Sequence, residues 1–152
     1  MKNNENNVTL SCMDGERGFQ IHGLNGYTLS IGIGGGHYCE NYARRSHEAC
    51  LPTATMEVAV MRDDAKQGHN AFVALVHDVA GYVPASNLSA LIDAVERHDW
   101  ERVCRLCGEE SPNPEKFPAG WSADKAEKGL AKTTFSEQVA EALKHEILSG
   151  RL

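Results

Sequence analysis

Asn25-Gly26-Tyr27-Thr28-Leu29-Ser30-Ile31-Gly32-Ile33 is the stretch that decides the fold. From Tyr27 onward it alternates apolar residues with polar or small ones, which is the pattern of a strand with one face against a core. Asn-Gly at its start is the strongest short-range signal of a β-hairpin, because both central residues of the tight turn take a positive φ. The strand is therefore expected to pair with a preceding strand that carries Phe19, Ile21 and Leu24.

Three further segments complete a predicted antiparallel sheet of four to five strands. They are Val8 to Cys12, Thr55 to Arg62 and the apolar run Ala71 to Val76. Within the middle one, Met56, Val58 and Val60 share the face expected to meet the core. Residues 37–52 have no clear periodicity and predict a long loop, a kind of segment that is often functional in a compact domain.

After Pro84 the hydrophobic period changes from that of a strand to that of a helix. The apolar stripe of the expected amphipathic helix consists of Leu88, Leu91, Ile92 and Val95, with Ser86 as its N-cap. The apolar spacing is interrupted near His98, which predicts a break in the helix. Asp99 is then expected to cap a second helix that ends near Gly108. The sequence thus predicts one α+β domain over residues 8–107, with the sheet packed on this helical segment.

Prolines and charges after this domain predict a linker over residues 108–133. Residues 134–150 then predict a C-terminal amphipathic helix, which opens on a capping box. Its apolar stripe includes Val139, Leu143 and Ile147. We expect this stripe either to dock on the core or to contact a partner.

The composition is that of a globular protein and excludes several classes. The 152 residues contain 15 basic and 21 acidic side chains, a net charge of -6, and this acidic balance argues against non-specific nucleic-acid binding. No apolar run approaches the ~20 residues of a membrane span, and the polar first seven residues contain no apolar core of a signal peptide. Five cysteines, an odd number, indicate free thiols in a reducing compartment, so a cytoplasmic protein is expected; the oligomeric state is left open.

Cys104-x-x-Cys107-Gly108 has the spacing of one half of many zinc sites. The other half would come from the 37–50 loop, which offers His37, Cys39, His47 and Cys50; Cys39 and Cys50 are the preferred pair. Both Cys104 and Cys107 also fit the helical stripe, where cysteine acts as a small hydrophobic residue. We therefore expect no cofactor, and keep a zinc-stabilised module as the alternative.

The 37–50 loop is also the stretch richest in side chains suited to recognition. Its candidate partner contacts are His37, Tyr38, Tyr42, Arg44 and Arg45, which join the stripe of the C-terminal helix as expected partner-binding residues. The chain contains no nucleophile elbow, dinucleotide fingerprint or phosphate-binding loop. A non-enzymatic protein is therefore the preferred interpretation, with an enzyme site in this loop as a weaker one.

Two stretches resemble known proteins. Tyr27-x-Leu-Ser-Ile-x-x-Gly-x-x-x-Tyr38-Cys39-x-Asn41, Glu57-Val58-Ala59-Val60 and Gly81-Tyr82-Val83-Pro84-x-x-x-Leu88 lie within residues 26–95. This part resembles small accessory proteins encoded by bacteriophages and prophages, a group that implies a setting and no assigned activity. The segment from Phe135 to Leu152 resembles the first helix of GntR-type winged-helix repressors. Because only that helix is matched, no element would enter a major groove, and DNA binding is not carried over.

The sequence as a whole predicts a small cytoplasmic binding protein encoded by a phage or prophage. It would act by contact with a partner protein, for instance as an inhibitor of a host function.

Overall fold

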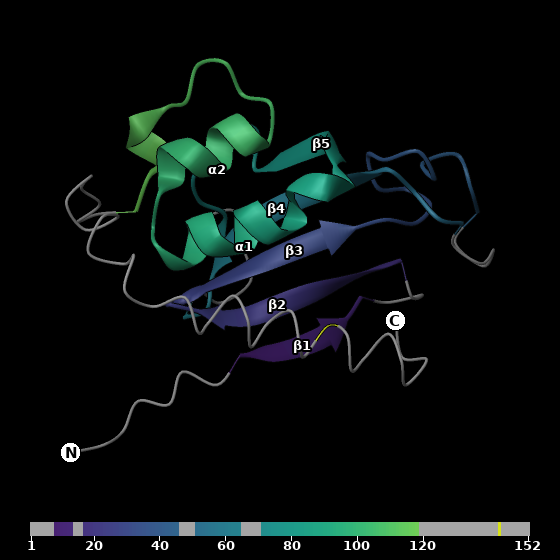
Figure 1. Ribbon diagram of the computed structural model, residues 1–152, viewed down its shortest axis with the longest axis horizontal. Helices are drawn as coiled ribbons and strands as arrows, with labels where there is room; N and C mark the ends of the chain where they lie inside the picture. The colour runs from purple at the N-terminus through teal and green to yellow at the C-terminus, as the bar shows by residue number, and fades with distance from the viewer. Residues whose placement is uncertain (1–7, 14–16, 46–50, 65–70, 119–142, 144–152) are drawn as a thin grey trace.

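The computed structural model describes residues 8–13, 17–45, 51–64, 71–118 and 143. A five-stranded antiparallel sheet carries two helices on one face, which confirms the α+β prediction (Figure 1). The strands lie side by side in chain order: β1 Thr9–Cys12, β2 Gly18–Leu24, β3 Tyr27–Gly32, β4 Thr55–Arg62 and β5 Val79–Pro84. The helices are α1 Leu88–Glu96 and α2 Trp100–Leu106, with short 3-10 turns η3 Ala85–Asn87 and η4 Pro114–Lys116. None of the helices in the described ranges is long and apolar enough to cross a membrane.

The β2–β3 hairpin forms at the predicted turn. Asn25 and Gly26 have φ values of 52° and 95°, as the expected two-residue turn requires. Antiparallel pairing sets Leu29 of β3 opposite Ile21 of β2 and Val60 of β4. Since side chains alternate between faces, this register puts the apolar set of all three strands on the same side of the sheet.

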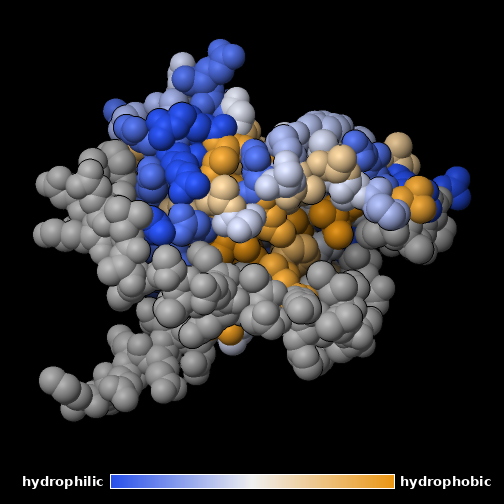
Figure 2. Space-filling model, in the orientation of Figure 1, coloured by the Kyte–Doolittle hydropathy of each residue, from blue (hydrophilic) through white to orange (hydrophobic). Residues whose placement is uncertain are grey.

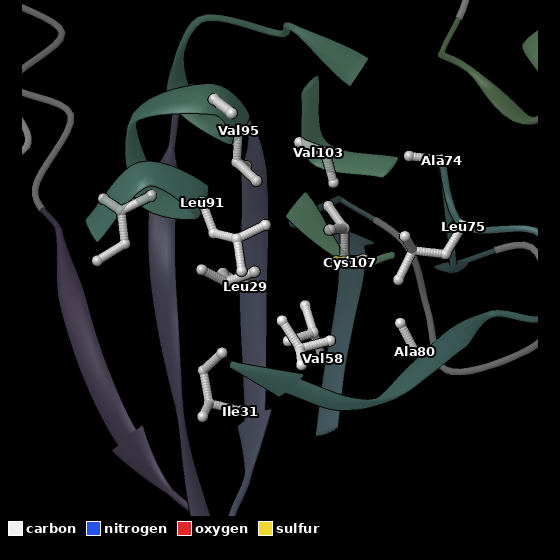
Figure 3. Close-up of a cluster of buried hydrophobic side chains, with 14 of the residues drawn as sticks. Leu29, Ile31, Val58, Ala74, Leu75, Ala80, Leu91, Val95, Val103 and Cys107 are labelled. Carbon is white, nitrogen blue, oxygen red and sulfur yellow. The ribbon is translucent and has the colours of Figure 1, made fainter. Parts of the chain in front are cut away.

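The core lies between that face and the helices. Figure 3 shows Leu29, Ile31 and Val58 from the strands pointing toward Leu91 and Val95 of α1. In Figure 2 apolar side chains also gather where the helices meet the sheet. The five side chains named above from Figure 3 are each at most 1% exposed. Burial of each contributes about 1.5–3 kcal/mol, so this layer is the main stabilising element of the fold.

The prediction of a fifth strand over residues 71–76 was wrong. Residues 71–76 form an irregular segment whose only ladder contact among the described residues is an isolated bridge from Phe72 to Met61. Ala74 has a φ of 70°, and its N–H donates to the carbonyl of Lys116 in η4 at 2.9 Å. The run is apolar because it is buried beneath this turn, and an apolar run without alternation does not distinguish a strand from other buried segments. The fifth strand is β5, which starts at Val79.

The helix boundaries follow the prediction except at the first N-cap. Ser86 lies inside η3, and the N-cap of α1 is Asn87, which makes no side-chain capping bond. The predicted break is confirmed, because α1 ends at Glu96 and the Asp99 carboxylate accepts from the N–H of Arg102 to cap α2. Gly108 follows with a φ of 82°, as expected after a helix end.

The described part of the predicted linker, residues 108–118, packs against the core segment 71–78. The Glu109 carboxylate accepts from the N–H of Val76 at 2.8 Å, and the Lys116 ammonium lies 2.8 Å from the Asp78 carboxylate. The rest of the linker and most of the C-terminal helix, with Val139 and Ile147, lie outside the described residues. Leu143 is helical and packs, partly buried, against the core, so at this position the stripe contacts the chain itself.

Candidate interaction surface

The loop between β3 and β4 is organised around Asn41. This side chain is 5% exposed, and its Nδ2 donates to the carbonyls of Ile33 and Leu51, at 2.8 Å in each case. A side-chain amide has two N–H donors, so both are used. Because Ile33 follows β3 and Leu51 precedes β4, one side chain ties the two ends of the loop together.

Two carboxylates bind the loop backbone. Glu57 of β4 accepts from the N–H of Tyr38 through Oε2 and lies 2.9 Å from Nδ1 of His37 through Oε1. Glu40 accepts from the N–H of Ala54 at 2.9 Å. Hydrogen bonds to ionised carboxylates are stronger than neutral ones, so they fix the loop against β4. His37, predicted as a partner contact, here has a positioning role toward Glu57.

A tight turn at Gly35 and Gly36 lies against the later part of the loop, from Tyr42 to Arg44. The N–H of Gly36 donates to the carbonyl of Tyr42 at 3.0 Å, and a Cβ added at Gly35 would overlap the carbonyl oxygen of Arg44. Only glycine allows this close approach of two backbone segments. In the segment that returns to this turn, Arg45 is exposed and Arg44 is partly buried.

Tyr38, Tyr42, Leu51 and Tyr82 form what we call the tyrosine surface. They are the exposed large hydrophobic side chains of the described residues, with exposed fractions between 48% and 56%. The rings of Tyr38 and Tyr42 stack with centroids 5.4 Å apart and planes 7° apart. The carbonyl of Tyr38 accepts from the N–H of Tyr82, and the backbone carbonyl of Leu51 accepts from the Asn41 amide. The loop lies at the end of the sheet away from the β2–β3 turn (Figure 1).

Two residues of the tyrosine surface, Tyr38 and Tyr42, are also partner contacts that the sequence predicts, whereas Tyr82 and Leu51 are not predicted. Tyr82 lies in a strand, where an aromatic residue normally predicts packing, and its φ of 54° at the register shift between β4 and β5 leaves it exposed instead. No local sequence signal marks such an irregular residue.

The cysteines of the predicted zinc site have the surroundings of packed thiols. Cys104 and Cys107 are in the core, with the Cys104 thiol donating to the carbonyl of Ala74, and Cys39 is buried below the glycine turn. No group of three or more His, Cys, Asp or Glu within the described ranges could hold a metal ion, but His47 and Cys50 lie outside those ranges. The zinc alternative therefore stays a prediction, which elemental analysis tests: one zinc per chain, lost on Cys104→Ser, would establish it.

The buried thiols predict a loss of stability in alkali. Burial raises the pKa of Cys104 and Cys107 to about 12 from an ordinary value of 9.0, and Glu109 adds to the shift at Cys104. The folded chain thus keeps protons that the unfolded chain releases, so this stabilisation is complete below about pH 9 and is lost as the pH rises toward about 12. We expect a fall on the order of 1 kcal/mol per pH unit for each thiol in urea unfolding.

A matched pair of variants isolates this effect. The double variant Cys104→Ala, Cys107→Ala should have a shallower alkaline slope, whereas Cys12→Ser, at an exposed thiol, should keep the slope of the natural chain. Tyr27, whose pKa burial also raises, is present in both and contributes equally. Equal slopes in all three proteins would contradict the assignment.

In comparisons with known proteins, no family model, no curated protein and no solved structure matches the chain.

Proposed function

We propose that the chain is a binding protein that contacts a partner protein through the tyrosine surface. The observation that carries the proposal is that the large hydrophobic side chains exposed in the described residues are three tyrosines and a leucine, of which Tyr38 stacks on Tyr42 and accepts through its carbonyl from the N–H of Tyr82. Exposed apolar surface of this kind marks interaction sites, and tyrosine and arginine are enriched among the residues that dominate binding energy. Tyrosine also supplies a large contact area at a small cost in side-chain entropy.

The loop is built to hold these rings in place before binding. Asn41, Glu57 and Glu40 use their polar atoms on the loop's own backbone, and Tyr38 is stacked on Tyr42. A preorganised surface loses little conformational entropy on association, which raises affinity. This arrangement supports recognition by a fixed surface rather than by a segment that folds on binding.

The charges of the loop suit an acidic partner surface. Arg45 is exposed three residues after Tyr42, whereas the carboxylates of Glu57 and Glu40 accept from backbone N–H groups. An arginine at the rim favours carboxylates, which it binds in a bidentate manner. The resemblance of residues 26–95 to phage and prophage accessory proteins makes a bacterial host protein the partner class that we propose, with occupation of that protein as the mode of action.

Affinity capture with matched variants tests the proposal. A tagged chain expressed in bacterial cells should retain one protein at about stoichiometric level, and Tyr42→Ala and Tyr82→Ala should each reduce its recovery about ten-fold or more. The control is Arg105→Ala on α2, whose side chain is 63% exposed and lies outside the tyrosine surface. Unchanged recovery with both tyrosine variants, or no protein retained at that level, would refute the proposal.

A further inference from the structure

A line of polar side chains crosses the sheet face opposite the helices, from β1 through β2 and β3 to the residue after β4. Ser11 Oγ lies 2.7 Å from Nε2 of His22, and Nδ1 of His22 lies 2.9 Å from Oγ1 of Thr28. The Thr28 hydroxyl in turn donates to Oδ1 of Asp63 at 2.5 Å. The four side chains thus form one continuous hydrogen-bonded chain that ends in a carboxylate.

The network assigns the proton on each group. A hydroxyl carries one proton, and the Thr28 hydroxyl gives its proton to Asp63, so toward His22 it can only accept. Nδ1 of His22 must then carry the ring hydrogen. In the neutral imidazole Nε2 is left with a lone pair, and the group facing that lone pair is the Ser11 hydroxyl.

The scaffold holds the histidine and leaves the serine accessible. A register shift between Ile21 and Leu24 marks a β-bulge beside His22, and bulges re-aim side chains next to functional sites. Thr28 is 2% exposed, and the N–H of Asp63 donates to the carbonyl of Gly26, which ties the carboxylate end to the hairpin turn. Ser11, in contrast, is exposed on β1.

We propose that Ser11 is an activated nucleophile that accepts acyl groups from small activated esters, with His22 as its general base. Thr28 and Asp63 are positioning residues that fix the imidazole tautomer. The arrangement is that of a nucleophile, a base and a third group that orients the base, which is the general requirement for an activated hydroxyl. This inference is independent of the tyrosine surface, because none of the four residues belongs to it.

The chemical step balances without any further reactant except water. Ser11 Oγ forms a bond to the ester carbonyl carbon while its proton moves to Nε2 of His22. The bond from that carbon to the leaving alkoxide then breaks, and the alkoxide takes the proton from His22 and departs as the alcohol. Water attacks the acylated serine in the same manner, which releases the carboxylic acid and restores the Ser11 hydroxyl.

Labelling of the full chain with a fluorophosphonate tests the proposal directly. In this reaction Ser11 Oγ bonds to phosphorus, fluoride leaves, and the serine proton passes to His22. We expect one adduct per chain, located at Ser11 by peptide mass analysis and absent from Ser11→Ala. His22→Gln should slow labelling by about 100-fold, the size of a typical general-base contribution. Ser89→Ala, which removes another exposed serine on α1, should label like the natural chain.

A second pair of variants separates a positioning role from a structural one. Thr28→Val keeps the side-chain shape but cannot relay the hydrogen bond, so it should slow labelling about ten-fold, and Thr28→Ser should restore the rate. Hydrolysis of p-nitrophenyl acetate should follow the same order across all variants. Labelling spread over several serines, or a Ser11 rate that His22→Gln and Thr28→Val leave unchanged, would overturn the proposal; so would the absence of any adduct.

Discussion

Trp100→Ala is expected to lower the free energy of unfolding by about 3–5 kcal/mol, among the largest effects of any single substitution in the described chain. Trp100 is fully buried at the start of α2. Its ring contacts Tyr27 edge to face, with centroids 4.7 Å apart, and stacks on His98 at 5.3 Å. Removal of the indole leaves a cavity between α2 and the β2–β3 hairpin and also loses two aromatic contacts. Urea unfolding followed by circular dichroism measures the change.

Trp100→Phe is the matched control for this prediction. The indole N–H of Trp100 is buried and has no hydrogen-bond acceptor in the described part of the chain. Phenylalanine removes this unsatisfied donor, whose burial is itself unfavourable, and keeps most of the apolar contact. We therefore expect Trp100→Phe to cost about 1 kcal/mol, well below the cost of the alanine variant. Equal destabilisation by the two variants would show that the cavity argument is wrong.

Gly35→Ala is expected to disorganise the β3–β4 loop while leaving the sheet folded. The added methyl group would overlap the backbone carbonyl of Arg44, and a backbone atom cannot move aside as a flexible side chain can. The loop must then open, which breaks the bond from the N–H of Gly36 to the carbonyl of Tyr42. We expect a local loss of about 2 kcal/mol, seen as roughly 30-fold faster amide hydrogen exchange in the loop.

Ala43→Ser is a suitable control because Ala43 is exposed in the same loop. It should leave both the exchange rates and the recovery of the partner unchanged, whereas Gly35→Ala should lose the partner together with loop protection. If Gly35→Ala exchanged like the control, the loop would not depend on the close approach at the glycine turn. If the loop opened but the partner were still bound, the preorganised surface would not be the contact site.

Local signals in the sequence were sufficient for the elements they define. Asn25-Gly26 fixed the hairpin because its two residues accept the positive φ values of the turn. Alternation predicted Thr55–Arg62 with its bounds as found, since Met56, Val58 and Val60 on one face of β4 are fully buried while most residues of the other face are partly exposed. Asp99 was found because a side-chain cap depends only on the next three residues.

Features that depend on the path of the backbone in space were not predictable in the same way. Asn41 is the centre of the loop because Ile33 and Leu51 come together around it, and no spacing in the sequence indicates this. The apolar run 71–76 has the composition of a buried strand but is held by bonds to residues about forty positions later. The exposed position of Tyr82 depends on an irregular backbone within β5.

The polar chain from Ser11 to Asp63 is a still clearer case. The sequence contains no motif that marks this nucleophile setting, because the four residues are separated by 6 to 35 positions and come from different strands. They meet only after four strands have paired in one register, and a shift of one residue in β2 would move His22 to the other face of the sheet. Such a constellation is visible in a structure and not in a motif.

Photo-crosslinking in bacterial cells tests the central claim, that the chain acts through the tyrosine surface, most directly. A benzoyl-phenylalanine placed at position 42 or 82 keeps an aromatic ring at the proposed contact, and the same residue at the exposed position 101 on α2 is the control. The account predicts one discrete crosslinked product from positions 42 and 82 and none from position 101. No product from 42 and 82, or an equal yield from 101, would contradict it.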